Sequence, residues 1–291
     1  MATAAQWIEG ARPRTLPAAI APIAVGTGVA AAVGSAVPLR AVLALVVMVA
    51  AQVGVNYAND YSDGVRGTDR ERVGPVRLVG QGLAPPSAVR AAALASLGVS
   101  AVAGLVLVAL IGQWWLLGAG AISLLAAWLY TGGPKPYGYL GLGEVSVFIF
   151  FGIVPVAGTA YVQALAFPAA AWVAGTGVGA VICAVLVANN LRDIPTDAST
   201  GKRTLAVRMG DRATRALYVV LIVCAFAVIA PLVVLGLTWA WLGLLAVPLA
   251  IRPVLGVTRG AVGPALIAVL QGTGLLVLGY GLLLGLGLAL S

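Results

Sequence analysis

Long apolar runs are the feature that most constrains how this chain can fold. Of its 291 residues, 61% are hydrophobic and only 9% are charged, whereas a soluble domain carries about 25% charged residues. Nine of the runs are long enough to cross a bilayer, and each is expected to be a helix because lipid cannot satisfy an open backbone. The sequence therefore predicts an all-α membrane protein, with one transmembrane domain over residues 1–291 and nine transmembrane helices. The expected spans are residues 16–34, 41–59, 91–111, 114–130, 144–162, 169–188, 216–237, 239–256 and 262–290.

The distribution of charge predicts how these helices are oriented. If the N-terminus faces the cytoplasm, every basic residue except Arg40 falls on the cytoplasmic side of the nine-helix arrangement, as the positive-inside rule requires. All nine acidic residues fall on the same side. The sequence thus predicts a multi-pass protein of the cell (plasma) membrane, with a cytoplasmic N-terminus, an external C-terminus and polar chemistry that faces the cytoplasm.

Composition excludes several classes of function. The chain contains no histidine, so His-based acid–base catalysis, His metal sites and Ser-His-Asp triads are ruled out. The net charge of +8 lies in loops between apolar helices rather than on a soluble basic domain, so nucleic acid is not an expected partner. Membrane lipid is the expected surrounding.

Two short acidic motifs stand at the cytoplasmic ends of the second and sixth predicted spans. A carboxylate near a bilayer is costly unless something uses it, and this chain has only nine acidic residues. The spacing of the first motif places its side chains on one helix face. The second motif has the same spacing with one extra residue before its last Asp, and Pro195 within it should end or distort the helix. The alternative is that these carboxylates only cap helix ends in cytoplasmic loops. Because two motifs of similar spacing occur in a chain with so few acidic residues, we favour two halves of one site. The motifs are Asn56-x-x-x-Asp60-x-x-Asp63 and Asn189-x-x-x-Asp193-x-x-x-Asp197.

The side chains of these motifs favour a magnesium–diphosphate site. Carboxylate and carboxamide oxygens suit Mg²⁺, which commonly binds one or two carboxylates together with substrate phosphates. Two facing motifs could hold two or more Mg²⁺ ions around one diphosphate, with nearby Arg and Lys binding the remaining oxygens. A diphosphate at the rim of a lipid-facing bundle suggests a polyprenyl diphosphate whose tail lies in the membrane. Departure of an allylic diphosphate leaves a cation, which aromatic rings can stabilise. Several aromatic residues lie near the cytoplasmic helix ends. Their alternative role there is to anchor the helices at the membrane interface.

The residues of both motifs resemble the UbiA superfamily of intramembrane aromatic prenyltransferases. The best local match is the segment NNLRDIPTDASTGKRTLAVRMG at residues 189–210. The first motif of the family, N-D-x-x-D-x-x-x-D, is matched by Asn59, Asp60 and Asp63; Gly67 stands at its last position, and Asp69 is the candidate replacement. The resemblance implies a UbiA-type bundle of nine helices, an inward N-terminus and Mg²⁺-dependent prenyl transfer.

Within the superfamily, the chain is similar to the 1,4-dihydroxy-2-naphthoate polyprenyltransferases of menaquinone biosynthesis. This similarity implies that a long isoprenoid is transferred from a polyprenyl diphosphate to 1,4-dihydroxy-2-naphthoate, with loss of the carboxylate as carbon dioxide, to give demethylmenaquinone. The segments that carry it are ARP at 11–13, TLP at 15–17, NDY-x-D at 59–63, GPVR at 74–77, YTGGP at 130–134 and GLGEV at 141–145.

The resemblance also implies roles for individual residues. The expected metal ligands are Asn56, Asp60, Asp63, Asp69, Asn190, Asp193 and Asp197, and the catalytic residues among them are Asp60, Asp63, Asp193 and Asp197. The candidate contacts of the diphosphate or of the acceptor carboxylate are Arg72, Arg77, Lys135, Lys202 and Arg203. The candidate acceptor-binding or cation-stabilising residues are Tyr57, Tyr130, Tyr137 and Glu144. Glu144 could instead pair with a nearby cation.

Three other functions fit the sequence less well. A CDP-alcohol phosphotransferase is also helical and Mg²⁺-dependent, but Asp63-Gly64 matches only the start of its motif. An ion-coupled transporter should place polar groups near the middle of the bilayer, whereas here they gather at one rim. A related enzyme with another acceptor, such as 4-hydroxybenzoate, haem or a sugar phosphate, is the closest alternative.

Overall fold

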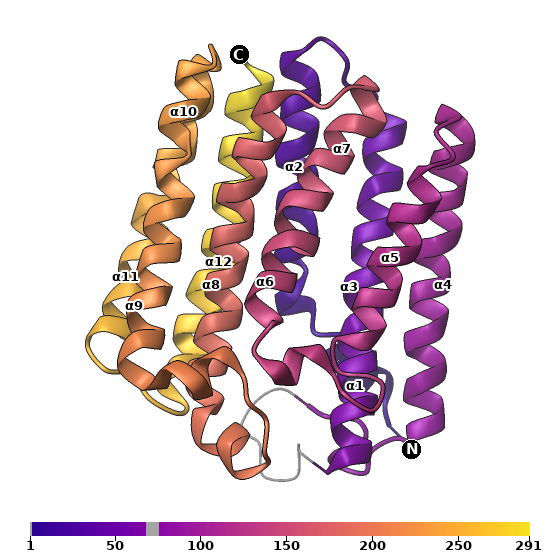
Figure 1. Cartoon of the computed structure of the whole chain (residues 1–291), viewed down its shortest axis with the longest axis vertical. Coiled ribbons are helices and arrows are strands. Elements are labelled where there is room, and N and C mark those ends of the chain that lie inside the picture. Colours follow the sequence, from indigo (N-terminus) through magenta and orange to yellow (C-terminus); the bar gives the residue numbers. More distant parts are fainter. Residues whose placement is uncertain (1, 68–75) are drawn as a thin grey trace.

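The structure is a computed structural model that describes residues 2–67 and 76–291, and within these ranges the secondary structure is entirely helical. The helices form an upright bundle with α1 at one end and the C-terminal end of α12 at the other (Figure 1). The elements are α1 Ala4–Gly10, η1 Pro13–Thr15, α2 Pro17–Ala32, α3 Pro38–Arg66, α4 Pro86–Ile111, α5 Leu116–Leu129, η2 Tyr137–Leu140, α6 Gly143–Val147, η3 Phe148–Ile153, α7 Val154–Ala164, α8 Ala169–Ser199, α9 Leu205–Ala227, α10 Ile229–Val234, η4 Thr238–Ala246, α11 Val247–Thr258 and α12 Ala265–Ala289.

Each of the nine expected spans coincides with a helical segment, but not all of these segments are long enough to count as a membrane span. Within the described residues, seven helices are long and apolar enough to cross a membrane. The first expected span, α2, reaches the required length only together with α1 and η1, which meet it at a bend of 46°. The fourth expected span is α5, which has only 14 residues. An all-helical bundle with seven candidate spans is therefore established, and nine crossings remain a prediction.

The helices that carry the two acidic motifs are longer than expected. The apolar runs end near residues 59 and 188, whereas α3 continues to Arg66 and α8 to Ser199. The expectation that Pro195 ends or distorts α8 was wrong as to its end, because the helix continues through this residue. A proline removes one backbone hydrogen bond. Near Pro195, threonine hydroxyls donate to backbone carbonyls: Thr196 Oγ1 to the carbonyl of Asp193, and Thr200 Oγ1 to the carbonyl of Thr196. Asp193 and Asp197 therefore stay on one helix face.

Two groups of helices make up the bundle. In the first, α8 packs against α2, α7, α9 and α12, and 72% of its most apolar stretch is buried inside the protein. Glycines permit close approach here: a Cβ on Gly28 of α2 would lie 2.2 Å from the backbone oxygen of Gly285 in α12. In the second group, α3 packs along α4, with α5 beside both. A cavity lies between the two groups.

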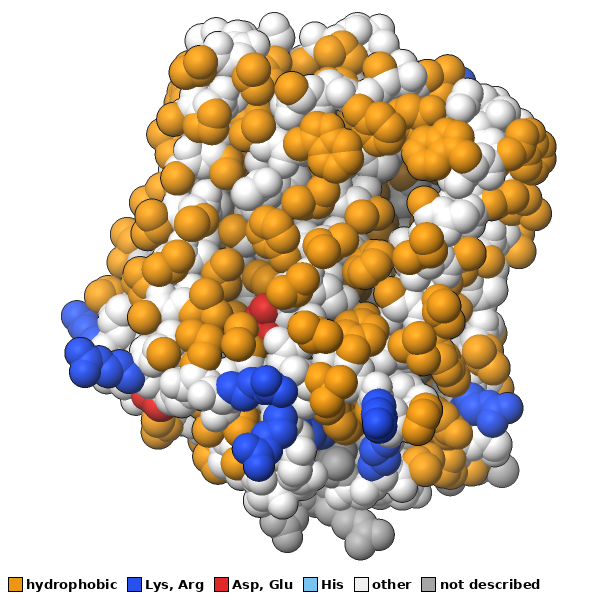
Figure 2. All heavy atoms as spheres, viewed as in Figure 1, with side chains coloured by type: hydrophobic (Ala, Val, Ile, Leu, Met, Phe, Trp, Pro, Cys, Tyr) orange, Lys and Arg blue, Asp and Glu red, His pale blue; other side chains and the backbone are white. Residues whose placement is uncertain are grey.

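Charge gathers at one end of the bundle. Figure 2 shows Lys and Arg side chains clustered at the lower end of the molecule, the end at which α1 lies, while hydrophobic side chains cover the flanks above them. Large exposed hydrophobic residues include Leu105 on α4, Val223 on α9 and Leu286 on α12. An apolar flank bounded by a basic end is the surface that a membrane-embedded protein presents to lipid.

Candidate active site

A cavity of about 1560 Å³ lies between the two groups of helices. Polar and charged side chains line it near the basic end, among them Asn59, Asp63 and Lys202. Apolar side chains line the rest, including Met48 on α3 and Leu107 near the distal end of α4. Leu116, at the start of α5, also lines it, so the cavity follows the helices from the basic end towards the opposite end.

The two acidic motifs meet at the polar end of this cavity. Asp63 from α3 and Asp197 from α8 both line it, and both are buried. The Lys202 Nζ lies 3.3 Å from Asp63 Oδ1 and 4.6 Å from the centre of the Tyr139 ring, and the Tyr139 hydroxyl donates a hydrogen bond to Asp63. Burying a carboxylate requires such compensation. The expectation that the motifs face each other across one site agrees with this geometry for Asp63 and Asp197.

The other two motif carboxylates do not line the cavity within the part of the chain that the structure describes. Asp60 is fully buried and accepts the backbone N–H groups of Leu78 at 2.8 Å and Val79 at 3.0 Å. Leu78 and Val79 directly follow Arg77, so these two bonds hold the buried Arg77 side chain at the cavity wall. Asp193 accepts two hydrogen bonds from the guanidinium of Arg192, at 2.7 and 2.9 Å.

The two asparagines predicted to assist the metal are held by protein partners. Asn56 Nδ2 donates to the Ala11 carbonyl at 2.8 Å and to Thr15 Oγ1 at 2.9 Å, which ties the N-terminal segment to α3. Asn190 Nδ2 donates to Glu144 Oε1 at 2.9 Å. Glu144 is buried, and its second oxygen has no hydrogen-bond partner within the described residues. Asn56 and Asn190 both line the cavity, so their role as metal ligands stays a prediction.

The predicted basic contacts fall into three groups. Arg77 and Lys202 are buried and line the cavity. Lys135 and Arg203 are exposed and are not part of its lining. Arg72 lies outside the described residues, as does the predicted metal ligand Asp69. Gly67, where the family pattern has its last Asp, ends α3 with a φ of 73°, a conformation that favours glycine.

Aromatic side chains line the cavity beside the charged end. Tyr130 and Tyr137 pack edge to face with ring centres 5.6 Å apart, and both line the cavity. The Tyr137 hydroxyl donates to the Ala126 carbonyl at 2.7 Å and lies 2.9 Å from Ser146 Oγ. Burial raises the pKa of Tyr137 above its ordinary value, and the bond to Ser146 opposes this in part, so the hydroxyl stays protonated at neutral pH.

Tyr57 is the predicted aromatic residue that the structure does not bring to the cavity. Its ring packs against Trp7 with centres 5.7 Å apart, and its hydroxyl donates to the Trp7 carbonyl at 2.8 Å. Because Tyr57 holds α1 against α3 and is not among the cavity-lining residues, a packing role accounts for it better than contact with a carbocation.

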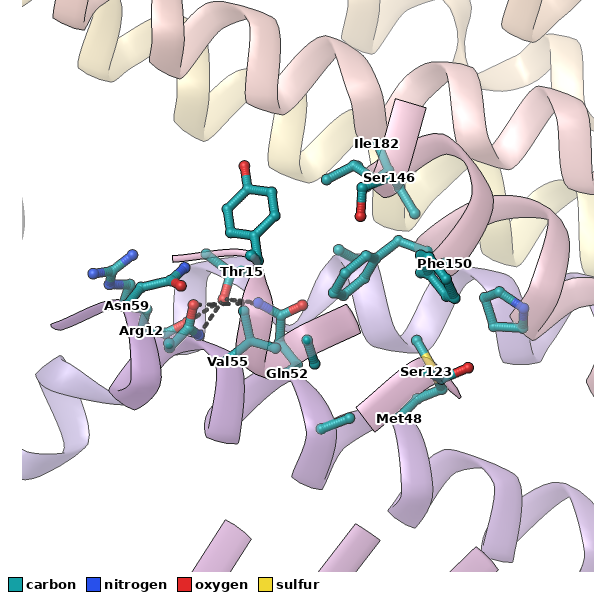
Figure 3. A pocket seen from close by; sticks show the side chains of 18 of the residues that line it. Arg12, Thr15, Met48, Gln52, Val55, Asn59, Ser123, Ser146, Phe150 and Ile182 are labelled. Carbon is teal, nitrogen blue, oxygen red and sulfur yellow. Dashed lines mark hydrogen bonds between the residues drawn. The ribbon is translucent and has the colours of Figure 1, made fainter. Parts of the chain in front are cut away.

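Sequence reasoning missed several cavity-lining residues. One of them is Arg192, whose Nη2 lies 2.8 Å from Oδ1 of the motif residue Asn189; both residues line the cavity. Two more are Gln52, which lies on α3 one helix turn before Asn56, and Thr15, which lies in η1 (Figure 3). The available signal was spacing: Gln52 lies four residues before Asn56, on the same helix face.

The donor set at the charged end fits Mg²⁺. Hard carboxylate oxygens from two helices line one space, and the Lys202 ammonium lies against Asp63 there. Within residues 2–67 and 76–291, no three acidic or Cys side chains form a complete metal-binding group. That incomplete set is compatible with Mg²⁺, which commonly takes its remaining ligands from water and substrate phosphates.

Fold and cavity together define a class: an all-helical protein of the membrane type, whose cavity joins a charged end to a long apolar channel. The chain belongs to the UbiA prenyltransferase family, whose sequence profile matches residues 19–261. It is 56% identical over 282 residues to the 1,4-dihydroxy-2-naphthoate octaprenyltransferase of Mycobacterium tuberculosis, covering 97% of this chain and 96% of that relative. It is 39% identical over 254 residues to the enzyme of the same name from Escherichia coli, covering 84% of this chain and 82% of that one.

Solved structures share the fold. A UbiA homolog from Archaeoglobus fulgidus, solved bound to GPP and Mg²⁺, superimposes with a TM-score of 0.61 at 16% identity, covering 95% of this chain and 98% of that chain. The apo structure of a UbiA homolog from Aeropyrum pernix gives a TM-score of 0.65 at 16% identity, covering 92% of this chain and 96% of the other. At such identities, this likeness establishes the architecture alone.

Proposed function

We propose that this UbiA family protein transfers a polyprenyl group from an allylic polyprenyl diphosphate to 1,4-dihydroxy-2-naphthoate. The carboxylate leaves as carbon dioxide, and the product is demethylmenaquinone, formed as its quinol. The observation that carries this proposal is the cavity, which joins Asp63, Asp197 and Lys202 to a long apolar channel. A diphosphate with a polyprenyl tail has the same division into a charged head and an apolar chain.

The chemistry follows from the two ends of the cavity. Asp63 and Asp197 would hold Mg²⁺, which neutralises the diphosphate and makes it a better leaving group. Lys202 and Arg77 bind phosphate oxygens that the metal leaves exposed. The carbon–oxygen bond of the allylic diphosphate breaks, and Tyr130 and Tyr137 shield the allylic cation from water. The ring carbon that bears the carboxylate takes up the cation; its bond to the carboxylate then breaks, carbon dioxide leaves, and the electron pair of that bond restores the aromatic ring.

Asp60 and Asp193 act through the groups that they hold. Asp60 fixes the segment that carries Arg77, and Asp193 fixes the Arg192 guanidinium at the cavity wall. A direct metal contact by either remains our prediction from the family motif, and so does a ligand role for Asn56, Asn190 and Asp69. The number of Mg²⁺ ions is proposed as two or more, one or more at each motif.

Naphthoate is favoured over other acceptors by the relatives. Those with 56% and 39% identity both bear the name 1,4-dihydroxy-2-naphthoate octaprenyltransferase, and each alignment covers more than four-fifths of both chains. An ion-coupled transporter is disfavoured because the buried charges Asp63, Asp197 and Lys202 lie at one end of the bundle rather than midway along it.

We also propose nine crossings of the plasma membrane, with the charged end of the cavity at the cytoplasmic face. The concentration of Lys and Arg at that end supports this orientation (Figure 2). The placement of α1 and of the C-terminal end of α12 at opposite ends of the bundle supports an odd number of crossings (Figure 1).

A direct assay tests the proposed reaction. Purified protein receives Mg²⁺, a radiolabelled polyprenyl diphosphate and, in separate reactions, 1,4-dihydroxy-2-naphthoate or 4-hydroxybenzoate. We expect labelled demethylmenaquinone with the naphthoate, release of carbon dioxide in equal amount, and no product after EDTA. Product from 4-hydroxybenzoate alone would overturn the acceptor assignment, and activity that survives EDTA would overturn the metal assignment.

A further inference from the structure

A buried glutamine inside the cavity has an acceptor atom that nothing above uses. Gln52 lies on α3, is 6% exposed and lines the cavity. Its Oε1 makes no hydrogen bond within the part of the chain that the structure describes. A buried acceptor without a donor is destabilising, so a donor from outside the protein is expected to meet it.

The surrounding hydrogen bonds fix which way the Gln52 amide points. The Thr15 hydroxyl donates its one hydrogen to the Arg12 carbonyl at 2.9 Å. It therefore can only accept from Gln52 Nε2 at 3.1 Å and Asn56 Nδ2 at 2.9 Å. Gln52 Nε2 also donates to Asn56 Oδ1 at 3.3 Å. Rotating the amide by 180° would set Gln52 Oε1 against oxygen atoms that have no hydrogen to give, so the oxygen must face away from Thr15.

The side that Gln52 Oε1 faces is the cavity. Figure 3 shows the amide nitrogen turned towards Thr15 and the oxygen turned towards the region that Phe150 lines. Gln52 precedes Asn59 by seven residues, which is about 10 Å along a helix at 1.5 Å per residue. The atom thus lies inward of the charged end by a distance that a diphosphate, its first isoprene carbons and an aromatic ring can span.

We propose that Gln52 Oε1 accepts a hydrogen bond from a ring hydroxyl of the aromatic acceptor and thereby selects a hydroxylated ring. This inference rests on the proposed function and concerns the same site. The prenyl tail has no hydrogen to donate and would leave the oxygen unsatisfied. A phenolic hydroxyl is a donor, and a flat ring fits beside the side chains of Val55 and Phe150, which line the cavity with Gln52 (Figure 3).

The test is inhibition by unreactive or slow analogues of the acceptor. The inhibition constants of 1-hydroxy-2-naphthoate, 4-hydroxy-2-naphthoate and unsubstituted 2-naphthoate are measured against prenylation of 1,4-dihydroxy-2-naphthoate. In the wild-type protein, at least one hydroxylated analogue should bind more tightly than 2-naphthoate. Gln52→Met should reduce that preference by about tenfold, the size of one buried hydrogen bond, and leave inhibition by 2-naphthoate and the KM for polyprenyl diphosphate unchanged.

Met48→Leu is the matched control. Met48 lies one helix turn before Gln52 on α3 and lines the same cavity, but its replacement leaves Gln52, Thr15 and Asn56 in place, so the preference for a hydroxylated analogue should persist. Should Gln52→Met not fold, Gln52→Asn gives the same test, because it keeps the amide and withdraws the oxygen by one methylene. An unchanged preference in the Gln52 variant, or no preference in the wild type, would overturn the inference. Failure of the wild-type protein to prenylate the naphthoate would instead overturn the proposed function.

Discussion

The four aspartates of the two motifs have two different environments, one for the middle position of each motif and one for the last. Asp63 and Asp197 face the cavity, whereas Asp60 and Asp193 face protein donors: two backbone amides in one case and a guanidinium in the other. All four are buried, and Asp63 too has protein donors, Tyr139 and Lys202; what separates the two pairs is that only Asp63 and Asp197 line the cavity, where a ligand can reach them. Substitutions within the motifs should therefore produce two distinct defects.

Asp63→Asn tests the first of these roles. The amide keeps the size of the side chain but removes the negative charge that Mg²⁺ and Lys202 require, so we expect kcat/KM for prenyl transfer to fall by at least about a hundredfold. Asp211→Asn is the control: Asp211 is exposed and pairs with Arg215 on the surface of α9, and such pairs contribute little to stability. Equal activity of the Asp63→Asn and Asp211→Asn proteins would contradict a metal-binding role for Asp63.

Asp60→Asn tests the second role. An amide can accept only one of the N–H groups of Leu78 and Val79 that the carboxylate accepts now, so the segment that carries Arg77 should detach. We expect faster proteolytic cleavage near residues 76–84 and a higher KM for polyprenyl diphosphate. The cleavage sites are read by mass spectrometry. If cleavage stays as in wild type while activity is lost, Asp60 acts at the metal rather than through the segment.

Among the elements, α2 and α12 approach so closely at Gly28 that no side chain fits there. The Cβ that Gly28→Ala adds would lie 2.2 Å from the Gly285 backbone oxygen, closer than atoms can approach, so the helices must separate. We expect Gly28→Ala to destabilise the protein by about 1–3 kcal/mol, seen as a lower midpoint of thermal unfolding in detergent. Gly98→Ala on α4, where nothing lies within 4 Å of the added carbon, should be neutral or stabilising, since Ala favours a helix by about 1 kcal/mol over Gly. Equal shifts in both variants would refute the importance of this contact.

The limits of sequence reasoning show most clearly at α3 and α8. Apolar runs predicted that a helix covers most of each segment, and the matched pair of acidic motifs predicted one divided site; Asp63 from one motif and Asp197 from the other line the same cavity. The helix ends were missed because polar residues end an apolar run without ending a helix. The partners of Asp60 could not be predicted, since they depend on how the chain returns through Leu78 and Val79 after α3. The direction of the Gln52 amide likewise depends on Thr15, which is distant in sequence.

For the molecule as a whole, the division into two helix groups accounts for the cavity. Small residues let α2, α7, α8 and α12 pack closely, whereas α3, α4 and α5 stand apart and leave a channel along the bundle. A lipid-tailed substrate can then stay in the membrane with its charged head at the basic end. The basic end and the C-terminal end of α12 lie at opposite ends of the bundle (Figure 1), so the proposed nine crossings place them on opposite sides of the bilayer.

Cysteine accessibility tests this topology. Cys183 and Cys224 are replaced by Ala, and single cysteines are introduced as Ala36→Cys, Ser199→Cys and Ser291→Cys, at three exposed positions. In right-side-out vesicles, a membrane-impermeant maleimide should label the cysteines at positions 36 and 291 but not the one at 199; inverted vesicles should give the opposite pattern. Labelling of all three in detergent confirms that each is reactive. An even number of crossings would return the C-terminus to the cytoplasm, so labelling of positions 199 and 291 from the same side would contradict nine spans. Labelling of position 199 from outside would contradict a cytoplasmic active site.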